Sequence, residues 1–404
     1  MTYGNAMLSV SDAARAVVQR MPRITGERVA IGAAVGRVLA ADIVAPRALP
    51  GFDNSAMDGY AARSADLPAT LPVVGVVAAG QLELPALPAR AAMRIFTGAP
   101  MPPGADTMVI QEDARRDGEL VELPASPPGE NVRVAGEDVA TGETVVAAGT
   151  RLGPWDIGIL GALGFTELPV ARAPRVALIA TGDELVDVTE VPGPGQLVDS
   201  SMHALAALVR EAGGVADAIG IARDNLASLA DRLAASAGYD AVITTGGVSV
   251  GDRDYVRPAL AAAGISLELY KVAMKPGKPF AFGMRAGPHP APVFGLPGNP
   301  VSTVVAFELF LRPALLAMQG ASTLDRPTAT VRVAGGYRKQ AGRAHYLRAH
   351  VARRGEQLLA VPHPKQGSAM MSSLVGCNAL VVIAAELTEL ADGAPAPAIL
   401  MGAV

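Results

Sequence analysis

Residues 244–255 combine glycines with oxygen-bearing side chains, a combination that can bind both anions and cations. The segment reads TTGGVSVGDRDY and follows the apolar residues 241–243, which predicts a buried strand, a tight loop and a helix. Glycines let a backbone approach a ligand closely, and amides at the start of a helix can face an anion. The candidate ligand-binding residues are Gly246, Gly247 and Ser249, and Asp254 offers oxygen to a hard cation such as Mg²⁺. A glycine turn that only connects a strand to a helix has the same composition.

A second candidate site is a lysine-rich bend that reads KVAMKPGKPF over residues 271–280. The chain has 34 basic residues but only five lysines, and three of these, Lys271, Lys275 and Lys278, lie in this bend. The Pro-Gly pair at 276–277 excludes a continuous helix. Ammonium groups are compact charges that suit phosphate or another tetrahedral oxyanion. We expect the bend to bind an anion, although a solvated surface loop is the alternative.

A third motif, GLPGNP over residues 295–300, begins a helix beside the same region. Asn299 can cap this helix, and Pro300 suits its first turn. With Pro297, these residues place a helix N-terminus where an anion could bind.

Strands must position these motifs, and they alternate with helices between residues 175 and 263. Strands are expected at 175–180, 215–221 and 241–244, and helices at 226–235, at 256–263 and from Ser200 or Ser201 to Arg210. This alternation predicts a parallel sheet whose ligands bind at the carboxyl ends of the strands. Glu184, Asp224 and Asp254 follow those ends, and together with Asp183 they would repel one another unless a cation or a proton compensated them, of which a bound Mg²⁺ is the simplest. We therefore predict a Mg²⁺ site with Glu184, Asp224 and Asp254 as ligands.

The rest of the chain divides into segments of different periodicity, which predicts an α/β multidomain protein. A mixed helical domain is expected at 1–45 and 140–172, an inserted small β domain at 46–139, the parallel sheet domain at 173–321 and an all-β, barrel-like domain at 322–404. Turn-like motifs in the inserted domain contain Asp58, Thr97, Arg133 and Asp138, which suit either turns or a site. In the last domain, most polar residues are expected in solvated turns, although they could instead complete an anion site; they are Arg343, Arg348, Lys365, Ser368, Ser372 and Ser373.

Composition excludes several classes of function. The net charge is −4 without a long basic run, which argues against nucleic-acid and anionic-membrane surfaces. The most apolar stretch, 301–318, carries Glu308 and Arg312 and is expected to be a buried helix rather than a membrane span. The single Cys377 and five scattered histidines lack the spacing of zinc ligands. No secretory signal is evident, so a cytoplasmic protein is expected.

These motifs together, in order and over most of the chain, resemble those of the molybdopterin molybdenumtransferase family, the MoeA-like proteins. The matching stretches are FDNSAMDGYA (52–61), TGAP (97–100), GED (136–138), TGDEL (181–185), the glycine loop, KPGKP (275–279) and GLPGNP (295–300). The glycine loop is shared with molybdopterin adenylyltransferases, whereas its combination with the lysine bend and the GLPGNP turn is specific. One departure is Ala369, where a glycine is more usual.

The resemblance implies a homodimer that inserts molybdenum from molybdate into adenylylated molybdopterin, releasing AMP with the help of Mg²⁺ or a similar ion. Its site would lie between the molybdopterin-binding sheet domain of one subunit and the inserted β domain of the other. It implies catalytic roles for Asp58, Asp138, Asp224, Asp254, Lys271 and Lys275. It implies substrate binding by Thr97, Arg133, Glu184, Gly246, Gly247, Ser249, Lys278, Pro297, Asn299 and Pro300.

The resemblance also bears on partners and alternatives. A molybdopterin adenylyltransferase and molybdoenzyme maturation proteins are expected partners, and nucleic acid and membrane are not. One alternative is a molybdopterin adenylyltransferase, which would leave the motifs before residue 140 unexplained. The other is a MoeA-like scaffold protein, which would not need the carboxylates and lysines of the candidate site. Molybdate and tungstate have similar shape and charge, so the sequence does not separate them.

Overall fold

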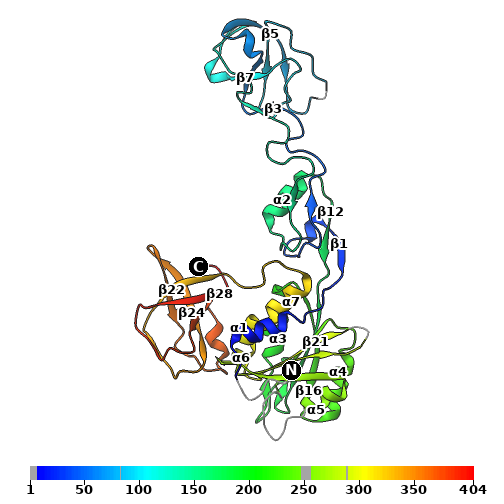
Figure 1. Ribbon diagram of the computed structural model, residues 1–404, viewed down its shortest axis with the longest axis vertical. Helices are drawn as coiled ribbons and strands as arrows, with labels where there is room; N and C mark the ends of the chain where they lie inside the picture. Colours follow the sequence, from blue (N-terminus) through cyan, green and yellow to red (C-terminus); the bar gives the residue numbers. More distant parts are fainter. Residues whose placement is uncertain (1–6, 82, 247–255, 288–289) are drawn as a thin grey trace.

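The protein is an elongated chain whose parts are strung along one long axis (Figure 1). The structure, a computed structural model, describes residues 7–81, 83–246, 256–287 and 290–404. The predictions for Gly247, Ser249 and Asp254 lie outside these residues. A small β module lies at one end, and the central sheet and the C-terminal barrel lie together at the other (Figure 1).

The central domain is built on a six-stranded sheet in which five strands run in one direction. Its order is β16 (Val215–Ala222), β13 (Arg175–Thr181), β17 (Ala241–Thr245), β21 (Ala291–Leu296), β20 (Pro279–Arg285) and β18 (Ile265–Lys271). The predicted parallel alternation holds for the first part, from β13 to β17. Strand β20 runs antiparallel to both neighbours, because β18, β20 and β21 follow one another without a crossover helix.

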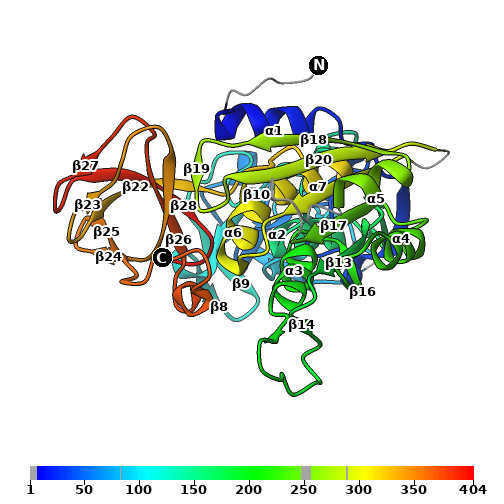
Figure 2. The ribbon, with the colours of Figure 1, turned by 90° about the horizontal axis from the view of Figure 1, so that it is seen from below.

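Helices cover both faces of this sheet and bury its apolar residues (Figure 2). One face packs against α1 (Val10–Val18), α3 (Ser201–Glu211), α6 (Pro300–Ala306) and α7 (Arg312–Gln319). The other face packs against α4 (Leu226–Ala235) and α5 (Val256–Ala262). Helix α1 begins after Ser9, because the Ser9 hydroxyl caps it by accepting a hydrogen bond from the Asp12 N–H at 3.1 Å.

The apolar stretch at 301–318 forms the core of this domain. Helices α6 and α7 are joined by a π-helical turn, Phe307–Leu311, into one helical segment, Pro300–Gln319. This segment is long and apolar enough to cross a membrane, but 83% of its most apolar window is buried inside the protein. The prediction of a buried helix is therefore confirmed.

The C-terminal domain is a closed five-stranded barrel, as the alternating pattern predicted. Its order is β24 (Ala344–Arg354), β25 (Gln357–Pro362), β22 (Thr328–Val333), β28 (Pro395–Leu400) and β26 (Ala379–Ile383), and β26 pairs again with β24. The short strand β19 (Met274–Lys275) of the lysine bend pairs with β24, which attaches the barrel to the central domain.

The distal β module contains a six-stranded sheet and a short pair, β3 (Asn54–Ser55) with β10 (Val132–Arg133). The sheet order is β7 (Thr107–Ile110), β4 (Gly59–Ala62), β6 (Ala92–Ile95), β5 (Ala69–Val77), β9 (Leu120–Leu123) and β8 (Arg115–Asp117). All four residues of β4 are buried because it lies inside the sheet, so they lack the inside-outside alternation that marks a half-buried strand.

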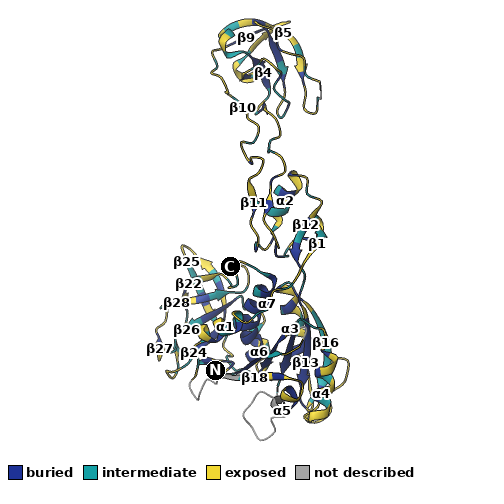
Figure 3. Cartoon of the chain, turned by 45° about the vertical axis from the view of Figure 1, so that its right-hand side comes forward, coloured by how far each residue is buried: buried dark blue, intermediate teal, exposed yellow. Residues whose placement is uncertain are grey.

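A small module connects the distal module to the sheet domain. It contains the pairs β1 (Gly26–Ala30) with β12 (Glu167–Ala171) and β2 (Ile43–Val44) with β11 (Thr144–Val146), and helix α2 (Pro154–Ala162). Helix α1 was grouped with this module in the sequence, but its buried residues Ala13 and Val17 join the core of the sheet domain. The two segments that lead on to the distal module are largely exposed (Figure 3).

Candidate active site

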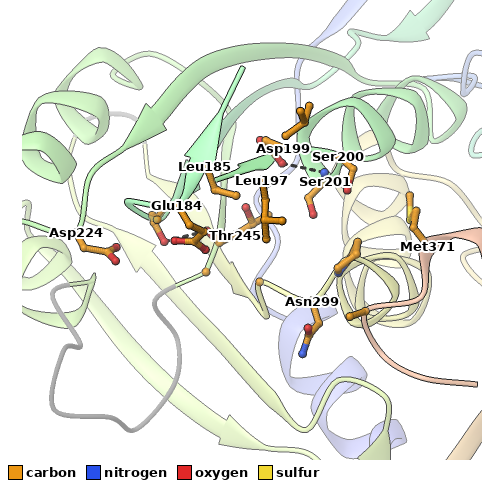
Figure 4. A pocket seen from close by; sticks show the side chains of 17 residues that line it. Glu184, Leu185, Leu197, Asp199, Ser200, Ser201, Asp224, Thr245, Asn299 and Met371 are labelled. Atoms are coloured by element: carbon orange, nitrogen blue, oxygen red, sulfur yellow. Dashed lines mark hydrogen bonds between the residues drawn. The ribbon is translucent and has the colours of Figure 1, made fainter. Parts of the chain in front are cut away.

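An acidic cavity of about 640 Å³ lies at the carboxyl ends of β13, β16 and β17 (Figure 4). The side chains of Glu184 and Asp224 lie at the same end of it, and Asn299 lies across the opening (Figure 4). The lining residues are Thr181, Gly182, Glu184, Leu185, Leu197–Ser201, Asp224, Thr245, Gly246, Gly298–Pro300, Ala369 and Met371. The strands therefore bring together Glu184, Asp224, Gly246, Asn299 and Pro300, which were predicted from widely separated motifs.

Hydrogen bonds between neighbouring loops fix the two carboxylates at this rim. The Asp224 N–H donates to Asp183 Oδ1 at 3.0 Å, and Arg223 Nη1 donates to the Asp183 and Leu185 carbonyls at 3.1 and 3.0 Å. Gly182 has φ +153°, and a Cβ there would lie 2.6 Å from Glu184 Oε2. A side chain at position 182 would therefore displace the Glu184 carboxylate from its place beside this residue.

Two of the three predicted metal ligands lie among the described residues. Both described ligands, Glu184 and Asp224, are exposed and offer oxygen donors, the type that Mg²⁺ prefers. The third predicted ligand, Asp254, lies outside the described residues. Within the described ranges, no group of three or more His, Cys, Asp or Glu side chains is placed to hold a metal ion. The donor chemistry fits Mg²⁺, and the ligand set remains a prediction.

A carboxylate that the sequence analysis missed, Asp199, lines the same cavity. It follows β15 (Leu197–Val198), which pairs with β14 (Leu185–Val186) in an arm that projects from the domain (Figure 2). Asp199 is buried, and its Oδ1 accepts the N–H of Ser201 at 2.9 Å. Helix α3 begins at the predicted position, with Ser200 as its N-cap residue, but the Ser200 hydroxyl makes no capping hydrogen bond and the Asp199 carboxylate accepts one instead. Asp is as good a helix cap as Ser, so the sequence Asp-Ser-Ser already contained this signal.

Gly246 lies where three strand ends converge. Its N–H donates to the Leu296 carbonyl at 3.0 Å, and its φ of +86° favours glycine. A Cβ at this position would lie 2.5 Å from the Thr181 carbonyl oxygen. Glycine is therefore required here by the packing of β13 against β17, independently of any ligand.

A basic cavity of about 590 Å³ adjoins the acidic one, and the two share Asn299. Its lining residues are Met274–Pro279, Asn299, Ser302, Arg343 and Gln366–Ser368. The 366–371 loop of the barrel also contributes Ala369 and Met371 to the acidic cavity. One barrel loop and one helix N-terminus therefore separate a carboxylate site from a lysine site.

The lysine bend is held against the barrel by backbone pairing. Lys275 is paired with His345 of β24, and the Ala344 N–H donates to the Ala273 carbonyl at 2.8 Å. Lys275 and Lys278 are exposed and line the basic cavity, and neither forms an ion pair in the described part of the chain. Lys271 ends β18 and is not among the residues that line either cavity.

His345 lies behind the bend without adding charge. Burial, and secondarily the charge of Lys275, lowers the pKa of His345 from 6.5 to about 4. Its Nδ1 lies 3.0 Å from the Tyr337 hydroxyl. At neutral pH the imidazole is uncharged, so it does not repel Lys275.

Arg348 holds the barrel loop in place. Its guanidinium donates to the Ser373 hydroxyl and to the Lys365 and Gly367 carbonyls, each at 3.1 Å. Arg348 is only 1% exposed and burial lowers its pKa, so the expectation that it lies in a solvated turn is wrong. The Ser368 carbonyl in turn accepts the Val301 N–H of α6 at 3.0 Å. The buried arginine thus positions the wall that both cavities share.

Helix α6 begins between the cavities as predicted. Pro300 occupies its first turn, and Asn299 is the N-cap residue. The Asn299 carboxamide makes no capping hydrogen bond, and it lines both cavities instead. The Pro297 carbonyl accepts the Thr303 hydroxyl at 2.6 Å, so this buried proline shapes the turn and is not among the lining residues.

Four predicted residues lie elsewhere, on the distal module and its connection. The N–H and the hydroxyl of Thr97 both donate to Asp58 Oδ1 at 2.8 Å, and these bonds lower the pKa of Asp58. Arg133 is paired with Asn54, and the Asp138 N–H donates to the Leu49 carbonyl at 3.1 Å. The module that contains α2 separates these residues from both cavities of the same chain (Figures 1 and 3).

Comparisons with known proteins agree with this architecture. Residues 8–164 match the family model of the MoeA N-terminal region (domains I and II), residues 177–317 match a probable molybdopterin binding domain, and residues 330–401 match the MoeA C-terminal region (domain IV). Molybdopterin molybdenumtransferase 2 from Mycobacterium tuberculosis is 37% identical, covering 96% of this chain and 98% of that protein.

Two further matches extend the comparison. Molybdopterin molybdenumtransferase from Nostoc sp. is 40% identical over 78% of this chain and 75% of its own length. The crystal structure of the molybdopterin biosynthesis MoeA protein from Pyrococcus horikoshii OT3 has a TM-score of 0.85 at 30% identity, covering 98% of this chain and 100% of that one. The family models and these near full-length relatives show that the chain belongs to the MoeA family.

Proposed function

We propose that this protein is a molybdopterin molybdenumtransferase: it inserts molybdenum from molybdate into adenylylated molybdopterin and releases AMP. Membership of the MoeA family already gives it a role in molybdenum cofactor biosynthesis. The observation that carries the specific reaction is the contact of an acidic and a basic cavity at one shared residue, Asn299. The two cavities can hold the phosphate-bearing and the oxyanion substrates side by side.

The basic cavity suits molybdate, a tetrahedral dianion. Lys275 and Lys278 supply two ammonium charges, while Arg343, Ser302 and Ser368 supply further donors around the same space. The substrate's own dithiolene sulfurs would replace oxygen ligands of molybdate, so a protein with the single Cys377 needs no thiolate of its own. Lys271 would act from the end of β18 as a further positive charge.

The acidic cavity suits the nucleotide phosphates with a divalent cation. Glu184 and Asp224 would hold Mg²⁺ with Asp254, and the bound ion would polarise phosphate oxygens as the phosphoanhydride bond is broken. The described residues would orient the phosphates between the ends of β13 and β17 and the start of α6. Gly247 and Ser249 are proposed to complete the loop that faces the phosphates.

We also propose that the protein works as a homodimer in which each site takes residues from both chains. The distal module and its connection, which contain Asp58, Thr97, Arg133 and Asp138, extend away from the domains that line the cavities of the same chain (Figure 1). The distal module also exposes four large apolar side chains near these residues in sequence, Phe52, Met57, Phe96 and Val134. A second copy could place this surface over the cavities.

Mixed dimers test this arrangement. Asp58→Ala and Asp224→Ala homodimers are expected to be inactive. Chains of the two variants, dissociated and reassociated together at equal concentration, should recover about a quarter of the wild-type activity, because half of the dimers are mixed and each has one intact site. Recovery of no activity from dimers that form normally would contradict the shared site.

The reaction itself is tested with purified protein, adenylylated molybdopterin, Mg²⁺ and molybdate. The expected result is molybdate-dependent release of AMP, together with cofactor that reconstitutes an apo-molybdoenzyme. Formation of adenylylated molybdopterin from ATP under the same conditions would instead support the adenylyltransferase alternative. Absence of both activities would reject an enzymatic role and leave the scaffold alternative.

The cellular context is also a proposal. We expect a cytoplasmic enzyme that receives its substrate from a molybdopterin adenylyltransferase and passes its product to molybdoenzyme maturation proteins. Family membership supports this place in the sequence of reactions. Co-purification from cytoplasmic extract with either partner is the corresponding measurement.

A further inference from the structure

Lys339 lies outside both cavities, yet its side chain organises the approach to one of them. It follows β23 (Tyr337–Arg338), which pairs with β27 (Glu389–Leu390) on the barrel. The Lys339 Nζ donates to the carbonyls of Arg343 at 3.0 Å and Ala385 at 3.1 Å, with a longer contact of 3.5 Å to the Gln340 carbonyl. The ammonium group therefore closes the 339–343 loop upon itself and ties it to the turn after β26.

Backbone hydrogen bonds attach the same loop at both ends. The Lys339 N–H donates to the Thr388 carbonyl at 2.8 Å, and the Gly342 N–H donates to the Ala385 carbonyl at 2.8 Å. Immediately beyond, the Ala344 N–H donates to the Ala273 carbonyl of the lysine bend. Arg343 is thus held between an anchored loop and the bend, and its side chain lines the basic cavity.

The residue type supports a specific role for this ammonium group. Lysine is rare in this chain, and arginine supplies most of its basic residues. Converging carbonyl oxygens suit the three donors of a compact ammonium better than the planar fork of a guanidinium. Within the described residues, Lys339 has no carboxylate partner at ion-pair distance, so its hydrogen bonds to carbonyls define its contacts.

We propose that Lys339 is a positioning residue for the oxyanion site: it fixes the 339–343 loop so that Arg343 faces the basic cavity beside Lys275 and Lys278. This inference rests on the proposed function, since it assigns Arg343 to the binding of molybdate. Lys339 does not touch the substrate in this proposal. Its effect on the reaction passes entirely through Arg343.

A double-mutant cycle in the full-length protein tests the proposal. Lys339→Met removes the donors, Lys339→Arg keeps the charge with the wrong geometry, and Arg343→Gln removes the group being positioned. Each single variant should raise the KM for molybdate about tenfold, the effect of losing one charge-assisted contact, and change kcat less than twofold. The Lys339→Met/Arg343→Gln double variant should have the same KM for molybdate as Arg343→Gln alone. Once the Arg343 guanidinium is absent, Lys339 has no group left to position.

Val331→Ala is the control for a purely structural effect. Val331 is buried in the same barrel core, so its truncation should lower Tm without changing the KM for molybdate. The proposal is overturned if Lys339→Met leaves the KM for molybdate unchanged, or if Val331→Ala raises it as much as Lys339→Met does. It is also overturned if the rises in KM caused by Lys339→Met and Arg343→Gln multiply in the double variant.

A further comparison separates this inference from the proposed function. If Arg343→Gln leaves the KM for molybdate unchanged while Lys275→Ala raises it, the positioning role is wrong and the oxyanion site stands. If the wild-type protein shows no molybdate-dependent release of AMP, the proposed function fails and this inference fails with it.

Discussion

The acidic and basic cavities share Asn299 but are assembled in different ways. Most of the acidic cavity is built from strand ends and helix starts of one sheet domain, where Glu184 and Asp224 follow β13 and β16. The basic cavity needs two domains, because its lysines lie on a bend and Arg343 and the 366–371 loop come from the barrel. The topology of one sheet therefore gathers the carboxylates, whereas docking between domains gathers the cations.

The cavities also differ in how their charges are compensated. Two carboxylates of the acidic cavity, Glu184 and Asp224, are exposed neighbours at one rim, which favours a bound cation. The basic cavity concentrates exposed ammonium groups beside an imidazole that is kept neutral by burial. One cavity thus attracts metal-bound phosphates and the other attracts an oxyanion.

The largest expected effect concerns the acidic cavity. Asp224→Ala should lower kcat for AMP release about 10³-fold, because a carboxylate that orients the cation and phosphates is lost. The exposed Asp231 on α4 offers a matched control, and Asp231→Ala should leave the rate unchanged. Equal loss of rate in both variants, or a loss that matches a fall in Tm, would mean that the cavity is not the reaction site.

The basic cavity should respond mainly in its affinity for molybdate. Lys275→Ala should raise the KM for molybdate up to about 100-fold, with a smaller change in the KM for adenylylated molybdopterin, because the lost charge faces the oxyanion. Lys365→Ala, which removes an exposed lysine outside the lining, should leave both constants unchanged. Similar rises in both constants would contradict a division of labour between the cavities.

The shared residue should affect both substrates moderately. Asn299→Ala should raise the KM of each substrate about tenfold, the loss of one hydrogen bond to a charged group. Its effect on Tm should be small, because the Asn299 side chain makes no capping bond to α6. A selective effect on one substrate would assign Asn299 to a single cavity.

The smallest expected effect is the pH dependence of stability from His345. Its pKa is lowered to about 4 in the folded chain from 6.5, so the unfolded chain binds the proton more readily as the pH falls below 6.5. The free energy of unfolding contributed by this group should therefore fall by about 1 kcal/mol between pH 7 and pH 5.5. Denaturant titrations of the wild type and His345→Gln at both pH values measure the difference; identical pH dependence in the two proteins would exclude a buried, neutral His345.

Local patterns predicted the elements that depend on nearby residues. The helix of residues 226–235 and three of the six sheet strands, β13, β16 and β17, followed from periodicity, and Glu184 and Asp224 followed from their positions after strand ends. The burial of Arg348 was not predicted, because it depends on closure of the barrel. For Arg343 and Ser368, both a solvated turn and an anion site stayed open, because no local pattern shows that their loops face the lysine bend.

By itself, the sequence determined the motifs, the order of strands and helices and the oxygen and ammonium chemistry, because these depend on residue type and on spacing over a few turns of backbone. The tertiary structure alone decided that the barrel docks on the lysine bend and that the 366–371 loop lies between the cavities. It also decided that the distal module and its connection, which contain Asp58, Thr97, Arg133 and Asp138, extend away from the sheet domain and the barrel (Figure 1). These outcomes depend on packing and hydrogen bonds between segments far apart in the chain, such as 273–275 with 344–345, which no local pattern encodes.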